Sequence, residues 1–167
     1  MIRPLIENDR KPVIDLLRAT GNFNAAELAI ADELMGIVIS QPGQRDYWSF
    51  VIEMVRDGQA VIAGFLVIGP VPATVGSWHM YWIAVDPSKY GTGIARSLER
   101  YAEDFVRRRG GYWLLAETSS QPSYERAHGF YRRQGYQTLA RIPDYYKPCD
   151  DLILFGKRLA TQGATKV

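Results

Sequence analysis

The residues best suited to chemistry lie in two short stretches of the sequence. The first, residues 85–96, carries two glycines, Gly91 and Gly93, directly before a strongly amphipathic segment. Apolar residues at helical spacing predict a helix over residues 93–109 that ends at Gly110. The free N–H groups and the positive dipole end of that helix would point into the glycine turn, where small residues let anion oxygens approach the backbone. The turn is therefore predicted to bind an anion, and a diphosphate is the natural ligand.

Other interpretations of the glycine turn stay open. Such a turn can be only a tight connection, and Lys89 and Arg96 could either add positive charge to it or be solvated surface residues. The absence of a following Gly-Lys-Ser/Thr argues against a Walker loop. The strands predicted before the turn form a meander, which does not fit the βαβ unit of a Rossmann domain. Nucleotide binding through the turn is thus the least favoured interpretation.

The second stretch, residues 124–136, reads Tyr-Glu-Arg-Ala-His-Gly-Phe-Tyr-Arg-Arg-Gln-Gly-Tyr. In order along the chain, the two stretches resemble the motifs of the GCN5-related N-acetyltransferases (GNAT). The first resembles their acetyl-coenzyme A loop, Arg/Gln-x-x-Gly-x-Gly/Ala, although Tyr90 stands where the family usually has Arg or Gln. The second resembles the motif Asn-x-x-Ala-x-x-Phe-Tyr-x-x-x-Gly-Phe/Tyr, with Tyr124 in place of the customary Asn.

This resemblance implies transfer of an acetyl group from acetyl-coenzyme A to a primary amine by direct attack in a ternary complex. It places the general acid at Tyr131, whose phenol hydroxyl can donate a proton to the departing thiolate. It places the general base at His79, with Glu117 as the reserve base and water relays as a further route. Residues implied to bind the cosubstrate are Ile83, Ala84, Val85, Tyr90, Gly91, Thr92, Gly93, Ile94, Ala95, Arg96, Tyr124 and Ala127.

Each catalytic candidate also has a purely structural interpretation. Tyr131 would suit an ordinary core position at a helix end, and His79 could be a strand histidine bonded to the backbone. Glu117 could simply pair with an arginine. The alternation of residues 78–85 places His79 on the same predicted sheet face as Tyr81, Ile83 and Val85. A catalytically silent coenzyme A-binding or interaction module of the same fold is the alternative function.

The acceptor is left open between a small amine and an amine of a peptide or protein. The resemblance implies an acceptor site formed by the first two helices and the late strands. Aromatic rings with acids suit a cationic, partly apolar amine, although such a set also suits a core or a dimer interface. The candidates are Phe23, Tyr47, Trp48, Trp78, Trp82, Asp144, Tyr145, Tyr146, Asp150 and Asp151.

Composition limits the protein class. The 167 residues are 47% apolar and 23% charged, which predicts one domain over residues 1–160 and a flexible tail over residues 161–167. The net charge of +2 does not indicate a nucleic-acid partner. The one cysteine, Cys149, cannot form an internal disulfide, and two histidines provide no zinc spacing, so no metal is expected. Without a signal sequence or an apolar membrane span, a cytoplasmic protein is expected, and a homodimer is compatible with these features.

The predicted elements describe a mixed α+β protein with about five to seven strands. The resemblance implies a mostly antiparallel, twisted sheet of six to seven strands, flanked by about four helices and splayed between the fourth and fifth strands. Helices are predicted at residues 12–19, 25–39, 93–109 and 122–134, and strands at residues 48–56, 59–68, 77–85, 111–118, 136–142 and 152–158.

Overall fold

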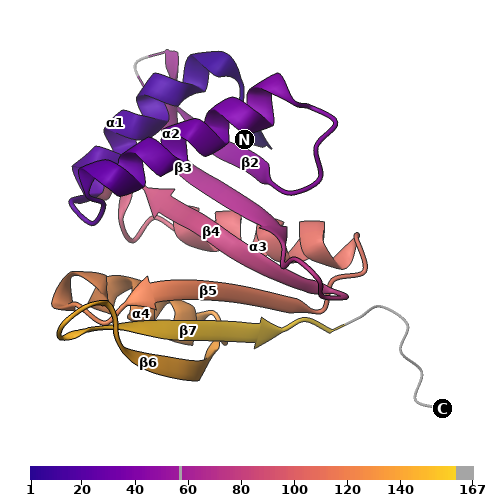
Figure 1. The fold of residues 1–167 in the computed structure, drawn as a ribbon. Helices are drawn as coiled ribbons and strands as arrows, with labels where there is room; N and C mark the ends of the chain where they lie inside the picture. Colours follow the sequence, from indigo (N-terminus) through magenta and orange to yellow (C-terminus); the bar gives the residue numbers. More distant parts are fainter. Residues whose placement is uncertain (57, 161–167) are drawn as a thin grey trace. The chain divides into compact units, whose positions relative to one another are not determined.

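The computed structural model describes residues 1–56 and 58–160 (Figure 1). Seven strands form one sheet in the order β1-β2-β3-β4-β5-β7-β6. Strands β4 and β5 pair in parallel, whereas β1 with β2, β2 with β3, β5 with β7 and β6 with β7 pair antiparallel. The predicted mixed α+β sheet is therefore confirmed. The tail predicted at residues 161–167, and Asp57 between two predicted strands, lie outside the described residues.

The observed elements extend the predicted ones at several ends. The strands are β1 Ile2–Pro4, β2 Trp48–Arg56, β3 Gln59–Pro70, β4 Ser77–Val85, β5 Trp113–Ser119, β6 Gln137–Lys147 and β7 Asp150–Arg158. The helices are α1 Arg10–Thr20, α2 Ala25–Ser40, α3 Ile94–Arg107 and α4 Glu125–Arg133. Short 3-10 turns lie at Glu7–Asp9, Pro87–Lys89 and Pro122–Tyr124.

Two compact units divide the chain. Unit 1 comprises Met1–Gly69 and Trp82–Ala102, and unit 2 comprises Pro70–Tyr81 and Glu103–Val167. Unit 1 thus holds the glycine turn and the start of α3, whereas unit 2 holds the start of β4, all of β5 to β7, and α4.

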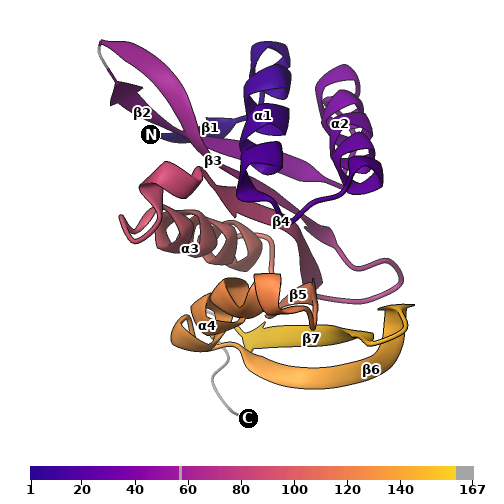
Figure 2. The same ribbon diagram turned by 90° about the vertical axis from the view of Figure 1, so that its left-hand side faces the viewer.

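In unit 1, α1 and α2 lie side by side on one face of the strands, and the start of α3 lies on the other face (Figures 1 and 2). Helix α2 begins with a capping box, because Asn24 Oδ1 accepts the Glu27 N–H at 3.0 Å while a Glu27 carboxylate oxygen accepts the Asn24 N–H at 2.8 Å. This box satisfies backbone donors that the helix leaves unpaired at its start.

Helix α3 approaches the sheet of unit 1 closely at Gly64 of β3. A Cβ atom built there would lie 2.9 Å from Leu98 Cδ1 of α3 and 3.0 Å from the carbonyl oxygen of Ala84. Both Leu98 and Ala84 are buried, and the Phe50 ring meets the Tyr101 ring edge-on with centroids 4.8 Å apart. The missing side chain at residue 64 therefore lets α3 pack directly on the strands.

In unit 2, the β4–β5 ladder is short. Paired residues run only from Ser77 with Trp113 to His79 with Leu115, although β5 continues to Ser119 and β4 to Val85. This is the predicted splay between the fourth and fifth strands. Strand β6 lies at the sheet edge, is exposed along its length and contains Pro143, which a strand tolerates at an edge because no ladder partner needs its N–H. The strand predicted at residues 136–142 ended before this proline and was therefore shorter than the observed β6.

Candidate functional site

The glycine turn lies between β4 and α3, within unit 1. The Asp86 N–H donates to the carbonyl of Ala63 on β3 at 3.0 Å, and its carboxylate accepts the Ser88 N–H at 2.8 Å. Beyond the following 3-10 turn, Gly91 and Gly93 have φ angles of 79° and 88°. Residues with a Cβ atom rarely adopt such angles, which explains why glycine occupies both positions.

Several backbone donors of this turn are available to a ligand. The N–H groups of Lys89, Tyr90 and Thr92 donate to carbonyls within the turn. Among the described residues, no protein acceptor is found for the N–H groups of Gly91, Gly93, Ile94, Ala95 and Arg96. The last three belong to the first turn of α3, where an α-helix has no acceptors of its own. The turn is exposed at residues 91–93, so its backbone N–H groups alone can bind an anion.

The side chains around these donors have different environments. Ile94 is buried and anchors the start of α3, whereas Arg96 is exposed and Tyr90 is half-buried. The Thr92 hydroxyl donates to the carbonyl of Lys89 at 2.7 Å. Of the β4 residues implied to contact the cosubstrate, Ala84 and Val85 are buried and Ile83 is half-buried.

Unit 2 brings His79 and Glu117 together beside the end of the β4–β5 ladder. Burial lowers the pKa of His79 below its ordinary value of about 6.5, and the negative charge of Glu117 partly offsets that effect. The His79 ring stacks on Tyr81, with centroids 4.9 Å apart, as their shared predicted face requires. Burial therefore favours the neutral imidazole, which is the form that accepts a proton.

The burial of β4 residues alternates only as far as Tyr81. Trp78 and Met80 are buried while His79 and Tyr81 are half-buried, but the next residues, Trp82 and Ile83, are both half-buried and Ala84 and Val85 are both buried. Side chains still alternate between the two faces of a strand where neighbours are equally buried, because both faces can be covered. The ring contact supports the common face for His79 and Tyr81, and for Ile83 and Val85 the common face stays a prediction.

Some acceptor candidates gather near Glu117 in unit 2. Burial raises the pKa of Tyr146 to about 12, with further contributions from the charges of Glu117 and Asp150 and from Tyr145 and Tyr124. The Tyr145 and Tyr146 rings meet edge-on at 5.0 Å. Phe23, Tyr47, Trp48 and Trp82 belong to unit 1.

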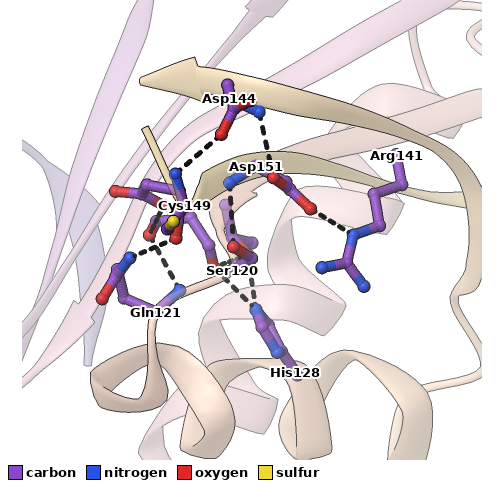
Figure 3. Close-up of polar contacts among 10 residues, drawn as sticks. Ser120, Gln121, His128, Arg141, Asp144, Cys149 and Asp151 are labelled. Carbon is purple, nitrogen blue, oxygen red and sulfur yellow. Dashed lines mark hydrogen bonds and ion pairs between the residues drawn. The ribbon is translucent and has the colours of Figure 1, made fainter. Parts of the chain in front are cut away.

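Three other acceptor candidates make structural contacts. Trp78 is 6% exposed and packs edge-on against Phe105, so it belongs to the core. Asp144 accepts the Cys149 N–H at 2.7 Å, and Asp151 accepts the Asp144 N–H at 3.0 Å and the Arg141 side chain at 2.5 Å (Figure 3). These carboxylates shape the β6–β7 hairpin, and their part in binding the acceptor stays a prediction. Sequence alone could not separate the roles, because hairpin and ligand contacts use the same residue types.

Tyr131 lies in an aromatic cluster of unit 2. It is 5% exposed, its ring stacks on Phe155 of β7 at 5.2 Å, and the Tyr136 ring is also 5.2 Å away. The cosubstrate candidates Tyr124 and Ala127 lie just before α4 and in its first half, and both are half-buried.

The polar turn that follows β5 was missed by the sequence analysis. Ser119, Ser120 and Gln121 connect β5 to the β6–β7 hairpin: the Ser119 hydroxyl donates to Asp150, the Asp151 N–H donates to the Ser120 hydroxyl, and the Gln121 side chain donates to the Cys149 carbonyl (Figure 3). His128 joins this turn from α4. Its helical spacing from Tyr131 was the signal that could have identified it.

Comparison with known proteins supports the family directly. A model of the acetyltransferase (GNAT) domain matches residues 45–138. A GNAT-family structure from Desulfovibrio desulfuricans is 30% identical with a TM-score of 0.89, covering 96% of this chain and 99% of that one. No curated protein sequence matches the chain.

Two more distant structures share the fold. An aminoglycoside 6'-N-acetyltransferase complexed with coenzyme A is 18% identical with a TM-score of 0.73, covering 98% of this chain and 99% of that one. The protein yncA from Salmonella typhimurium, solved with its cofactor acetyl-CoA, is 17% identical with a TM-score of 0.71, covering 100% of this chain and 98% of that one. The family model covers more than half of the sequence, and the fold agrees over nearly the whole chain, so this protein belongs to the GNAT family of acetyltransferases.

Proposed function

We propose that this protein is an N-acetyltransferase that transfers the acetyl group of acetyl-coenzyme A to a primary amine in a ternary complex. The observation that carries the proposal is the set of backbone N–H groups, at Gly91 and at residues 93–96, that have no acceptor among the described residues. In a GNAT-family chain, these donors suit the diphosphate of coenzyme A. The coenzyme A and acetyl-CoA complexes of the two distant structures are consistent with this ligand.

The acceptor must lose a proton before it can attack. A typical alkyl amine has a pKa of about 10.4 and is almost entirely protonated at neutral pH. His79 is the preferred base, because burial favours the neutral form of its imidazole, and Glu117 beside it is the reserve base, directly or through water. The tyrosines and carboxylates near Glu117 favour a cationic amine as acceptor.

The transfer then forms one bond and breaks another. The neutral amine attacks the thioester carbonyl, the new C–N bond forms, and the C–S bond breaks. The sulfur takes a proton from the Tyr131 hydroxyl, and the proton released by the acylated nitrogen returns to the Tyr131 oxygen through water, which leaves the neutral amide, free coenzyme A and a restored phenol. Diphosphate binding is assigned to unit 1 and the proton transfers to unit 2, and each assignment rests on the geometry within its own unit.

Two measurements test this function. Calorimetry should show binding of coenzyme A and acetyl-CoA, and thiol release over a panel of amines should show turnover with at least one of them. The Tyr131→Phe variant should lower kcat about 100-fold while the Kd for coenzyme A stays within about twofold, because only the proton donor is removed. Binding without turnover for any amine would favour a catalytically silent module, and no binding would remove the main support.

A further inference from the structure

Helix α4 buries one histidine that the proposed chemistry does not use. His128 is 1% exposed, and its Nε2 atom lies 2.7 Å from the Thr118 hydroxyl and 3.0 Å from the Ser119 carbonyl oxygen (Figure 3). Both partners are at the end of β5, two positions at most from Glu117. His128 therefore connects the helix that carries Tyr131 to the strand that carries Glu117.

The partners of this ring define its proton position. A carbonyl oxygen can only accept a hydrogen bond, so the contact with Ser119 requires a proton on Nε2. The Thr118 hydroxyl donates to the same carbonyl at 3.1 Å, which leaves its lone pairs available to the imidazole. An unprotonated Nε2 would direct its lone pair at the Ser119 oxygen in a buried place, which is unfavourable. The Nε2–H tautomer satisfies all three groups.

The other ring nitrogen has a weaker contact. Nδ1 lies 3.5 Å from a carboxylate oxygen of Glu125, whose side chain is 67% exposed. In the Nε2–H tautomer Nδ1 has no proton to donate to this carboxylate, which water solvates, so the contact does not hold the ring. The link to β5 is the contact that can hold α4 in place.

Tyr131 depends on the same packing. It follows His128 by one helical turn, and the two are the buried residues of α4. Both rings contact Phe155 of β7, at 5.5 Å for His128 and 5.2 Å for Tyr131. A rotation or shift of α4 that breaks the β5 link would therefore also displace the Tyr131 ring.

We infer that His128 is a positioning residue for acetyl transfer, which holds the Tyr131 hydroxyl in place through its Nε2–H bonds to Thr118 and Ser119. The inference rests on the proposed role of Tyr131. A displacement of a reacting group by about 1 Å can reduce a rate about 100-fold, so loss of this link is expected to affect kcat more than binding.

The test compares His128→Leu, which keeps the volume, with His128→Gln, whose amide can still donate. His128→Leu should lower kcat about 10-fold with the Kd for coenzyme A within about twofold, and His128→Gln should recover most of the loss. Glu125→Gln is the matched control and should leave kcat unchanged. If His128→Leu does not fold, the Thr118→Val variant is used in its place in every comparison. It removes the hydroxyl partner of His128 with little change of volume.

The decisive measurement is the double variant with Tyr131→Phe. A positioning residue that acts through Tyr131 should cause no further loss once the hydroxyl is gone, whereas a general structural role should lower kcat by the same factor in both backgrounds. Additive losses would overturn the inference and leave the proposed function intact. A Tyr131→Phe variant with normal kcat would instead overturn the acid assignment, and the positioning role with it.

A spectroscopic measurement tests the geometry without activity. Nitrogen-15 NMR of histidine-labelled protein, with the two histidine signals assigned by a His79→Gln variant, should show His128 protonated on Nε2 at neutral pH. A signal from the Nδ1–H tautomer would contradict the inference directly.

Discussion

The glycine turn of unit 1 and the polar turn of unit 2 use their polar groups in opposite ways. Residues 91 and 93–96 present backbone N–H groups with no protein acceptor among the described residues, and none of these donors needs a particular side chain. In residues 119–121, by contrast, each side chain is already hydrogen-bonded to the β6–β7 hairpin. A backbone site can therefore retain its ligand when its side chains change, whereas a site built from side chains depends on each residue.

The largest effect outside Tyr131 is expected at His79. Replacement by Gln removes the base and should lower kcat/KM about 100-fold at pH 7, with unchanged affinity for coenzyme A. The amine panel used for the parent enzyme measures this directly. A fall in kcat/KM of less than about threefold would show that His79 is not the base. The contrast between a backbone site in unit 1 and a side-chain site in unit 2 would then be too strong.

Glu117 should affect the pH dependence. Its negative charge raises the pKa of His79 against the stronger lowering by burial, so Glu117→Gln should lower that pKa further. The acidic limb of the kcat/KM profile should then move to lower pH, because the imidazole stays neutral in more acidic solution. If activity is lost over the whole pH range instead, Glu117 is the base and His79 is its partner.

A smaller effect is expected at the glycine turn. Gly93→Ala places a Cβ atom at a φ of 88°, which disfavours the turn and misaligns its donors, so the Kd for coenzyme A should rise about 10-fold. Gly21→Ala is the matched control, because its φ is 72° and both glycines have open space around them. Calorimetry should show unchanged affinity for the control, with a loss of about 1 kcal/mol in unfolding free energy for each variant. Equal affinities would rule out Gly93 as part of the anion site.

The smallest effect is expected at Tyr90. Tyr90→Phe should change the Kd for coenzyme A by no more than about twofold, because the donors of this turn belong to the backbone. Titration of the two proteins side by side is sufficient. A 10-fold weaker complex would give the Tyr90 hydroxyl a direct part in binding and would weaken the contrast between the turns.

The parts of the fold with strong local signals could be predicted from sequence. The glycines at residues 91 and 93 indicated the start of α3, and Gly110 indicated its end: the observed helix runs Ile94–Arg107, and the Gly111 N–H closes it on the Val106 carbonyl at 2.9 Å. Strand β4 was predicted with its observed bounds. The elements that were missed or shortened, β1 and the end of β6, depend on their strand partners more than on local propensity.

The site was predictable only in part, for a similar reason. Periodicity correctly grouped His79 with Tyr81, but it could not show that Trp78 is core, or that Asp144 and Asp151 shape a hairpin. Those roles depend on contacts between strands distant in sequence, which a single sequence does not specify. The link from His128 to β5 is of the same kind.

The bare Cα of residue 64 also limits how this enzyme can be altered. Because α3 rests against that position through Leu98, an added methyl group would lie 2.9 Å from Leu98 Cδ1 and 3.0 Å from the Ala84 carbonyl oxygen, so the Leu98 side chain or the neighbouring backbone would have to move. The direction in which the N–H groups of the first turn of α3 point therefore depends on packing against a strand some thirty residues earlier in the chain. Engineering for a different cosubstrate should therefore keep Gly64 unchanged together with the glycine turn.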